Sequence, residues 1–375
     1  MYVRTEIMKI GKIELSSPMV VAPMAGMTDT AFRRLVKRNG GCGLVVTEMV
    51  SSEGLVRGID RTLEYAEYTE EERPVSIQIF GGDPEKMAAA AQVVESMGAD
   101  IVDVNMGCPV RKIARHNAGC SLMREPEHAA EVIRAMTRAV RIPVTVKMRA
   151  GWDDSSRNAP ELARRVQDAG AAAVTIHGRT AEQSYSGLAD WELVARVADD
   201  LDIPVLGSGD CVEPEHITER LRAGISGVLV GRGVLRNPWI LAQADALSRG
   251  ATPPEVSRGQ RGQFLLDYMR LLLDERVGEG EGFRHSAPGF QADSAPARGR
   301  ERWVINKLRA LCAWYTKGVE GGGALRGRIN TAASLGEVLE LIDECFGVRV
   351  ATPAALPAPS PTLSPARSPA PVSIG

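Results

Sequence analysis

The sequence predicts a (β/α)8 TIM barrel, followed by a smaller all-helical domain and a disordered C-terminal tail. Eight short apolar segments alternate with segments of helical periodicity over roughly the first 240 residues, which is the pattern of a closed parallel barrel. A doubly wound open sheet usually has fewer strands, and no G-x-G-x-x-G motif follows the first strand. Beyond Trp239 the strand pattern ends and helical periodicity continues.

The expected strands are residues 19–22, 44–47, 75–80, 101–104, 144–148, 173–177, 205–207 and 227–230. A helix is expected after each strand, and Asp83-Pro84 is a good start signal because Asp caps free N–H groups and Pro suits the first turn. After the barrel, helices are expected over 257–276, 301–319 and 334–346.

These elements divide the chain into three parts. We expect a catalytic barrel over residues 1–242 and a helical domain over 243–348, with a flexible insertion near 278–299 that is rich in Gly, Ser, Ala and Pro. The tail over 349–375 is dominated by Pro, Ala and Ser, and such a composition cannot bury a core.

Composition excludes several classes of protein. With 44% hydrophobic and 25% charged residues, the 375-residue chain has the composition of a soluble protein, and no apolar run approaches the roughly 20 residues that span a bilayer. The N-terminus lacks the apolar core of a signal peptide. The six cysteines form no C-x-x-C pair, so neither a zinc site nor a disulfide framework is indicated. We therefore expect a cytoplasmic monomer without metal.

The net charge of −2 hides an uneven distribution. Residues 258–328 contain 13 Lys and Arg against 8 Asp and Glu, whereas the rest of the chain contains 32 against 39. A basic segment on an acidic body indicates a polyanionic partner, although a solvated helical surface would give the same count.

Cys108 is the first candidate for chemistry. It lies in Asn105-Met-Gly-Cys-Pro109, directly after the apolar segment 101–104. The carboxyl ends of parallel barrel strands carry the reactive groups of such enzymes. A thiol on this tight turn is therefore either a functional group or a buried, turn-forming cysteine.

Other strand ends supply polar groups that suit a planar ligand. Gln78 places an amide in an apolar barrel, and residues 22–25 let backbone amides approach a ring closely. Lys147 fits either a Schiff-base lysine or a cation that stabilises negative charge on a reduced flavin. The sixth strand ends in His177 and Arg179, either functional or structural.

Gly-rich turns follow the last two strands. Ser208, Gly209 and Asp210 follow the seventh strand, and Gly231 and Arg232 follow the eighth, with a helical segment behind them. In barrels this position binds phosphate through backbone N–H groups and the helix dipole. A phosphate at one end and a ring at the other together describe flavin mononucleotide (FMN).

The combined motifs resemble the tRNA-dihydrouridine synthases, and most of all their bacterial B-type branch. The matching residues, in order, are Ala22-Pro23-Met24-Ala25, Gln78, Asn105-Met-Gly-Cys-Pro109, Lys112, Gly119, Lys147-Met-Arg149, His177-Gly-Arg-Thr180 and Gly231-Arg232. The resemblance covers residues 11–242 and, more loosely, 257–347.

The resemblance implies an FMN-dependent enzyme that reduces uridine in the tRNA D-loop to 5,6-dihydrouridine with NADPH or NADH. It implies that Cys108 is the general acid and that Asn105 and Arg179 face the uracil. The implied flavin-binding residues are Pro23, Met24, Ala25, Gln78, Lys147, His177, Ser208, Gly209, Asp210, Gly231 and Arg232. Hydride would pass from flavin N5 to uracil C6, and the thiol would protonate C5; an ordinary thiol, with a pKa near ~8.5, is protonated at neutral pH.

Three positions depart from the family pattern: Ser208 replaces Asn, Ala181 stands where a basic residue is common, and Leu311 stands where His is frequent. Two alternatives remain, an FMN-dependent reductase of a free pyrimidine or other small enone and a non-catalytic RNA-binding barrel. The basic segment favours tRNA, and we expect Arg302, Lys307 and Arg309 to contact its phosphates.

Overall fold

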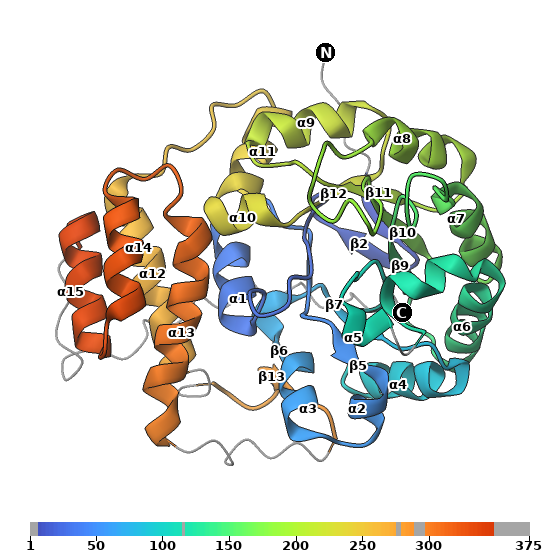
Figure 1. Cartoon of the computed structure of the whole chain (residues 1–375), viewed down its shortest axis with the longest axis horizontal. Helices are drawn as coiled ribbons and strands as arrows, with labels where there is room; N and C mark the ends of the chain where they lie inside the picture. Colours follow the sequence, from blue (N-terminus) through green and yellow to red (C-terminus); the bar gives the residue numbers. More distant parts are fainter. Residues whose placement is uncertain (1–6, 115–116, 275–278, 289–296, 349–375) are drawn as a thin grey trace, which may run out of the picture.

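The computed structural model of the chain describes residues 7–114, 117–274, 279–288 and 297–348, and it contains a closed parallel barrel (Figure 1). The last strand pairs with the first, and β4 pairs with both β3 and β7, which completes the ring. The barrel strands are β3 (Met19–Val21), β4 (Leu44–Val46), β7 (Val75–Phe80), β8 (Ile101–Met106), β9 (Val144–Arg149), β10 (Ala173–His177), β11 (Val205–Ser208) and β12 (Gly227–Val230). The predicted barrel is confirmed, and each strand ends within two residues of its expected bound.

Helices surround the strands because both faces of a parallel sheet must be covered. Figure 1 shows them as a ring outside the barrel. They are α1 (Thr30–Asn39), α4 (Pro84–Ser96), α6 (Pro126–Ala139), α7 (Ala159–Asp168), α8 (Trp191–Asp200), α9 (Pro214–Arg222), α10 (Arg232–Arg236) and α11 (Ile240–Ser248). Asp83 caps α4 as expected, since its Oδ1 accepts hydrogen bonds from the backbone N–H groups of Glu85 and Lys86.

Shorter elements lie in the connections between strands and helices. They are β5 (Val50–Ser51), α2 (Ser52–Val56), α3 (Asp60–Ala66), β6 (Tyr68–Thr69), the 3-10 turns η1 (Glu70–Glu72) and η2 (Gly119–Arg124), and α5 (Arg111–Ala114). They lengthen the loops on the first half of the barrel.

An antiparallel hairpin that the sequence did not predict packs on the amino end of the barrel. It consists of β1 (Met8–Ile10) and β2 (Ile13–Leu15). Its buried side chains join a cluster with residues at or near the amino ends of the strands, such as Leu44 and Ile101. The hairpin therefore leaves the carboxyl end as the open end of the barrel.

The helical domain lies beside α1 and α10 (Figure 1). It contains α12 (Arg258–Leu273), α13 (Ala297–Tyr315), α14 (Gly322–Thr331) and α15 (Leu335–Phe346). Three of these helices were predicted, whereas α14 was not, because its N-cap and first turn are a run of glycines, residues 321–323, that resembles a loop. Phe32 of α1 contacts the rings of Phe264 and Tyr268 of α12 edge-on, with centroids 6.1 and 6.4 Å apart.

Part of the expected flexible insertion packs against the barrel instead. Residues 284–285 form β13 (Arg284–His285), which pairs antiparallel with β6, and the His285 ring stacks on Tyr68 with centroids 4.6 Å apart. Ala287 is buried. The polar composition of the segment concealed this pairing, which depends on a distant strand. The expected disordered tail over 349–375 lies outside the described residues.

Candidate active site

The carboxyl ends of the barrel strands surround a cavity of about 670 Å³. Every site residue predicted from the sequence lines it, except Arg179. The lining includes Pro23, Met24, Ala25, Gln78, Asn105, Cys108, Lys147, His177, Ser208, Gly209, Asp210, Gly231 and Arg232. Their convergence follows from topology, because successive parallel strands place their ends at one edge.

A buried network fixes the amides on the floor of this cavity. Asp103 accepts hydrogen bonds from Gln78 Nε2 at 2.7 Å and from Thr145 Oγ1 at 2.6 Å. Gln78 Oε1 in turn accepts from Asn105 Nδ2 at 2.8 Å. Burial raises the pKa of Asp103, while these hydrogen bonds and the charge of Lys147 oppose the rise. Both amides are thus held in one orientation toward the cavity.

The Cys108 turn is shaped by its own chain. Asn105 Oδ1 accepts from the backbone N–H groups of Gly107 and Cys108 at 3.1 and 2.9 Å. The carbonyl of Cys108 accepts from the N–H of Cys120 at 3.1 Å. Burial raises the pKa of the Cys108 thiol, so it stays protonated at neutral pH. A protonated thiol at a cavity wall is equipped to donate a proton.

Lys147 brings a cationic group to the same cavity. Burial and the neighbouring Arg149 lower its pKa to about 8, although Asp103 and Cys108 pull it upward. The amine is therefore largely an ammonium group at neutral pH, and an anionic ligand would strengthen its charge further.

His177 is neutral at neutral pH. Burial, followed by the charges of Lys147 and Arg149, lowers its pKa to about 2. The imidazole therefore acts as a neutral hydrogen-bonding group and does not supply a proton as an imidazolium. Gly209 lies against this ring: its φ is +127°, and a Cβ there would lie 2.5 Å from Ala189 Cβ and 3.2 Å from His177 Cδ2. A glycine is required at this position.

Arg179 lies behind the cavity wall. Its side chain is 2% exposed, and Nη2 contacts both carboxylate oxygens of Asp210 at 2.7 and 2.9 Å. Nη2 also donates to the Gly187 carbonyl at 2.6 Å, and Nε donates to the Ser186 carbonyl at 3.1 Å. Asp210 also accepts from the N–H of Ala189 at 2.8 Å. The resemblance implied that Arg179 faces the uracil, whereas its hydrogen bonds and ion pair join the turns after β10 and β11.

Asp210 also connects to the last turn. Burial would raise its pKa, but the hydrogen bond from Ala189 and the two arginines hold the pKa below its ordinary value. Arg232 Nη2 lies 3.5 Å from Asp210 Oδ1, and its guanidinium stacks 4.8 Å above the ring of Tyr185. Asp210 therefore ties together the two turns expected to hold phosphate.

Comparison with known proteins identifies the family. The family model described as "Dihydrouridine synthase (Dus)" matches residues 20–350. The chain belongs to the dihydrouridine synthase family. A "Probable tRNA-dihydrouridine synthase" of Rickettsia bellii (strain RML369-C) is 37% identical over 325 residues, covering 86% of this chain and 92% of the relative. The "tRNA-dihydrouridine synthase B" of Xanthomonas campestris pv. campestris is 38% identical over 304 residues, covering 80% and 91%.

Two residues that line the cavity, Tyr185 and Trp314, were not predicted from the sequence. Tyr185 is 61% exposed at the rim, next to His177 with ring centroids 6.4 Å apart. Trp314 reaches the cavity from α13, although it lies far along the chain from the nearest strand-end motif, Gly231-Arg232. An aromatic residue in the turn that follows the His-Gly-Arg-Thr motif was a usable signal for Tyr185. No local signal marked Trp314.

The described residues contain neither a membrane-spanning helix nor a cluster of metal ligands. No helix among them is both long and apolar enough to span a bilayer. Within the same residues, no group of three or more His, Cys, Asp and Glu side chains is arranged to hold a metal ion.

Proposed function

We propose that this chain reduces uridine in the tRNA D-loop to 5,6-dihydrouridine, with FMN as its bound cofactor and NADPH or NADH as reductant. Family membership and the names of its relatives support the reaction class. The observation that carries the proposal is that Cys108 and Lys147 line one cavity together with the Gly-rich turns after β11 and β12, which are expected to bind phosphate. We propose a cytoplasmic monomer as the working form.

The cavity fits FMN in size and chemistry. Its volume of about 670 Å³ falls in the range of small-molecule sites, about 300–1,000 Å³. Gly209 lines the cavity with bare backbone packed against His177 and Ala189, where a Cβ would lie only 2.5 Å from Ala189 Cβ. The cavity thus offers a cation, oriented amides and a close backbone approach, the three features that a planar ring with a phosphate tail needs.

We assign the cofactor contacts to two ends of the cavity. Lys147 and Gln78 would hold the ring, with Pro23, Met24 and Ala25 packing against it. Ser208, Gly209, Asp210, Gly231 and Arg232 would hold the phosphate end, with His177 between the two groups. FMN would supply the hydride that C6 of the uracil receives.

The proton for C5 is assigned to Cys108. Because burial raises its pKa, the thiol carries its proton at neutral pH and can release it in the transition state as C5 gains charge. The neutral state of His177 removes one competing acid from the cavity. Cys108 is therefore the group that completes the reduction.

Asn105 is assigned to the uracil. Its oxygen is committed to the Cys108 turn and its nitrogen donates to Gln78, so the remaining amide hydrogen keeps a fixed direction. The uridine must leave its stack to reach this depth. Arg179 is assigned to holding Asp210 rather than to the base.

The test of this function is mass analysis of tRNA from a strain that lacks the gene. Loss of dihydrouridine at a D-loop position, restored by wild-type protein and not by Cys108→Ala, is the expected result. Unchanged dihydrouridine at every position would contradict it. A cavity that reduces a free pyrimidine, with tRNA unaffected, would favour the small-enone reductase.

A further inference from the structure

The β3–α1 loop, residues 22–29, forms one wall of the cavity. Its residues Pro23, Met24 and Ala25 face the proposed ring site. The loop has no strand or helix of its own. Its turn is closed by the N–H groups of Met27 and Thr28, which donate to the Met24 carbonyl at 3.0 and 3.1 Å, and contacts from outside hold this turn in place. Those contacts come from two different parts of the chain.

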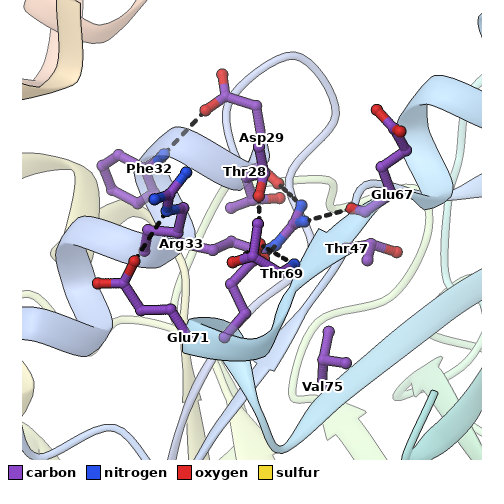
Figure 2. Close-up of polar contacts among 12 residues, drawn as sticks. Thr28, Asp29, Phe32, Arg33, Thr47, Glu67, Thr69, Glu71 and Val75 are labelled. Atoms are coloured by element: carbon purple, nitrogen blue, oxygen red, sulfur yellow. Dashed lines mark hydrogen bonds and ion pairs between the residues drawn. The ribbon is translucent and has the colours of Figure 1, made fainter. Parts of the chain in front are cut away.

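The barrel holds the loop from one side. Glu48, which follows β4, accepts through Oε2 from the Gly26 N–H at 2.5 Å. The guanidinium of Arg33 donates to the Thr28 carbonyl at 2.6 Å and is paired with the buried Glu72 at 2.5 Å. Figure 2 shows Arg33 together with Thr28 and Glu67, whose backbone carbonyls accept from its guanidinium.

The helical domain holds the loop from the other side. Lys307 of α13 places its Nζ 3.0 Å from Asp29 Oδ2, 3.2 Å from the Gly26 carbonyl and 3.7 Å from Glu48 Oε1. Tyr268 of α12 donates its hydroxyl to Asp29 Oδ2 at 2.8 Å. The side chain of Lys307 is 14% exposed, so it is not a free surface cation.

The charges make Lys307 the central member of this group. Burial raises the pKa of Glu48, and Lys307 is the largest influence that opposes the rise. Burial would also lower the pKa of Lys307, yet Asp29 and Glu48 raise it above its ordinary value. Removing the ammonium would leave two neighbouring carboxyl groups without it and would favour a protonated Glu48. A neutral carboxyl group is a weaker acceptor for the Gly26 N–H.

We propose that Lys307 is a positioning residue that fixes the β3–α1 loop from the helical domain, so that this domain completes the cofactor wall of the barrel. The link to the cofactor rests on the proposed FMN function, whereas the link to the loop does not. The proposal also replaces our expectation that Lys307 contacts tRNA phosphates, because its ammonium already lies against the loop and two carboxylates.

Amide hydrogen exchange of the full-length chain, measured without and with added FMN, tests the loop directly. In Lys307→Met we expect the amides of residues 26–28 to exchange about tenfold faster than in wild type, since local opening becomes easier. Lys307→Arg keeps the charge and should recover most of the protection. Arg302→Met, an exposed change on the same helix, serves as the matched control and should leave these amides unchanged.

A titration of FMN then connects the loop to the cofactor. We expect the dissociation constant of Lys307→Met to rise about tenfold, because a disordered wall must be ordered on binding. If wild type binds no FMN, the proposed function fails, but the exchange data still decide the loop. Unchanged exchange at 26–28 in Lys307→Met overturns the inference, as does a loss of tRNA affinity with exchange and FMN binding intact.

A milder variant covers the case in which Lys307→Met does not fold. Tyr268→Phe removes one hydroxyl and keeps the ring that packs on Phe32. Faster exchange at the same loop amides supports the role of the helical domain, and exchange equal to wild type overturns it.

Discussion

The barrel mouth and helix α13 differ in how well the sequence predicts the contacts of their residues. At the mouth, groups that follow separate strands converge on one cavity, as their positions after apolar segments indicated. On α13, three basic residues were expected to face tRNA, but only Arg302 is exposed. Lys307 contacts the β3–α1 loop, and Arg309 donates to the carbonyls of Ile329 and Ala332 at 3.0 and 2.7 Å. Topology fixes where strand ends lie, whereas a charge count does not fix where a charge points.

The largest effect is expected at the mouth. Cys108→Ala should keep FMN and tRNA binding and lose turnover by about 10²–10⁴-fold, the usual contribution of a general acid. Single-turnover reduction of unmodified tRNA measures it. Cys345→Ala, at a half-buried cysteine of α15, is the matched control. Near-normal turnover in Cys108→Ala would return the thiol to a structural role.

The pH dependence of FMN binding comes next. Because burial lowers the pKa of Lys147 to about 8, the ammonium is present below that pH and is lost above it. Wild-type affinity should therefore fall roughly tenfold per pH unit above pH 8, toward a limit set by the neutral amine. Fluorescence titrations between pH 7 and 9 measure it, and Lys147→Met should bind weakly at every pH. A flat wild-type profile would remove Lys147 from the ring site.

Arg309 offers the corresponding test on α13. Arg309→Met should cost about 1–3 kcal/mol of stability, because the carbonyls at the end of α14 lose their donors. Arg302→Met should change stability by less than about 0.5 kcal/mol, as exposed substitutions usually do. Chemical denaturation followed by circular dichroism compares the two. Equal stability of both variants would mean that Arg309 is a surface cation after all.

Arg302 and the tail should give the smallest effects. Arg302→Glu should weaken tRNA binding a few-fold and flatten its salt dependence by roughly one counterion. Binding as tight as that of wild type at matched salt would place the docking face elsewhere.

Removing residues 352–375 should change neither folding nor turnover, because a Pro/Ala/Ser tail cannot pack. A large loss of turnover on truncation would show that the tail has a partner.

The sequence predicted the features that depend on residues close together along the chain. Apolar segments and the turns after them predicted the eight strands and the site residues at the strand ends. All of these site residues except Arg179 line the cavity. The failures depend on distant partners. Arg179 pairs with Asp210, Lys307 pairs with Asp29 and Glu48, and β13 pairs with β6. Trp314 reaches the cavity only because α13 packs beside α10.

The most direct test of the account is reduction of unmodified tRNA by the purified full-length chain. With FMN and NADPH present, the account predicts that a D-loop fragment gains the mass of two hydrogens per modified uridine, in wild type and in Cys345→Ala. The gain should disappear without NADPH and fall sharply in Cys108→Ala. An unmodified D-loop with wild-type protein that holds FMN and oxidises NADPH would contradict the account, because the cavity would then serve a different substrate.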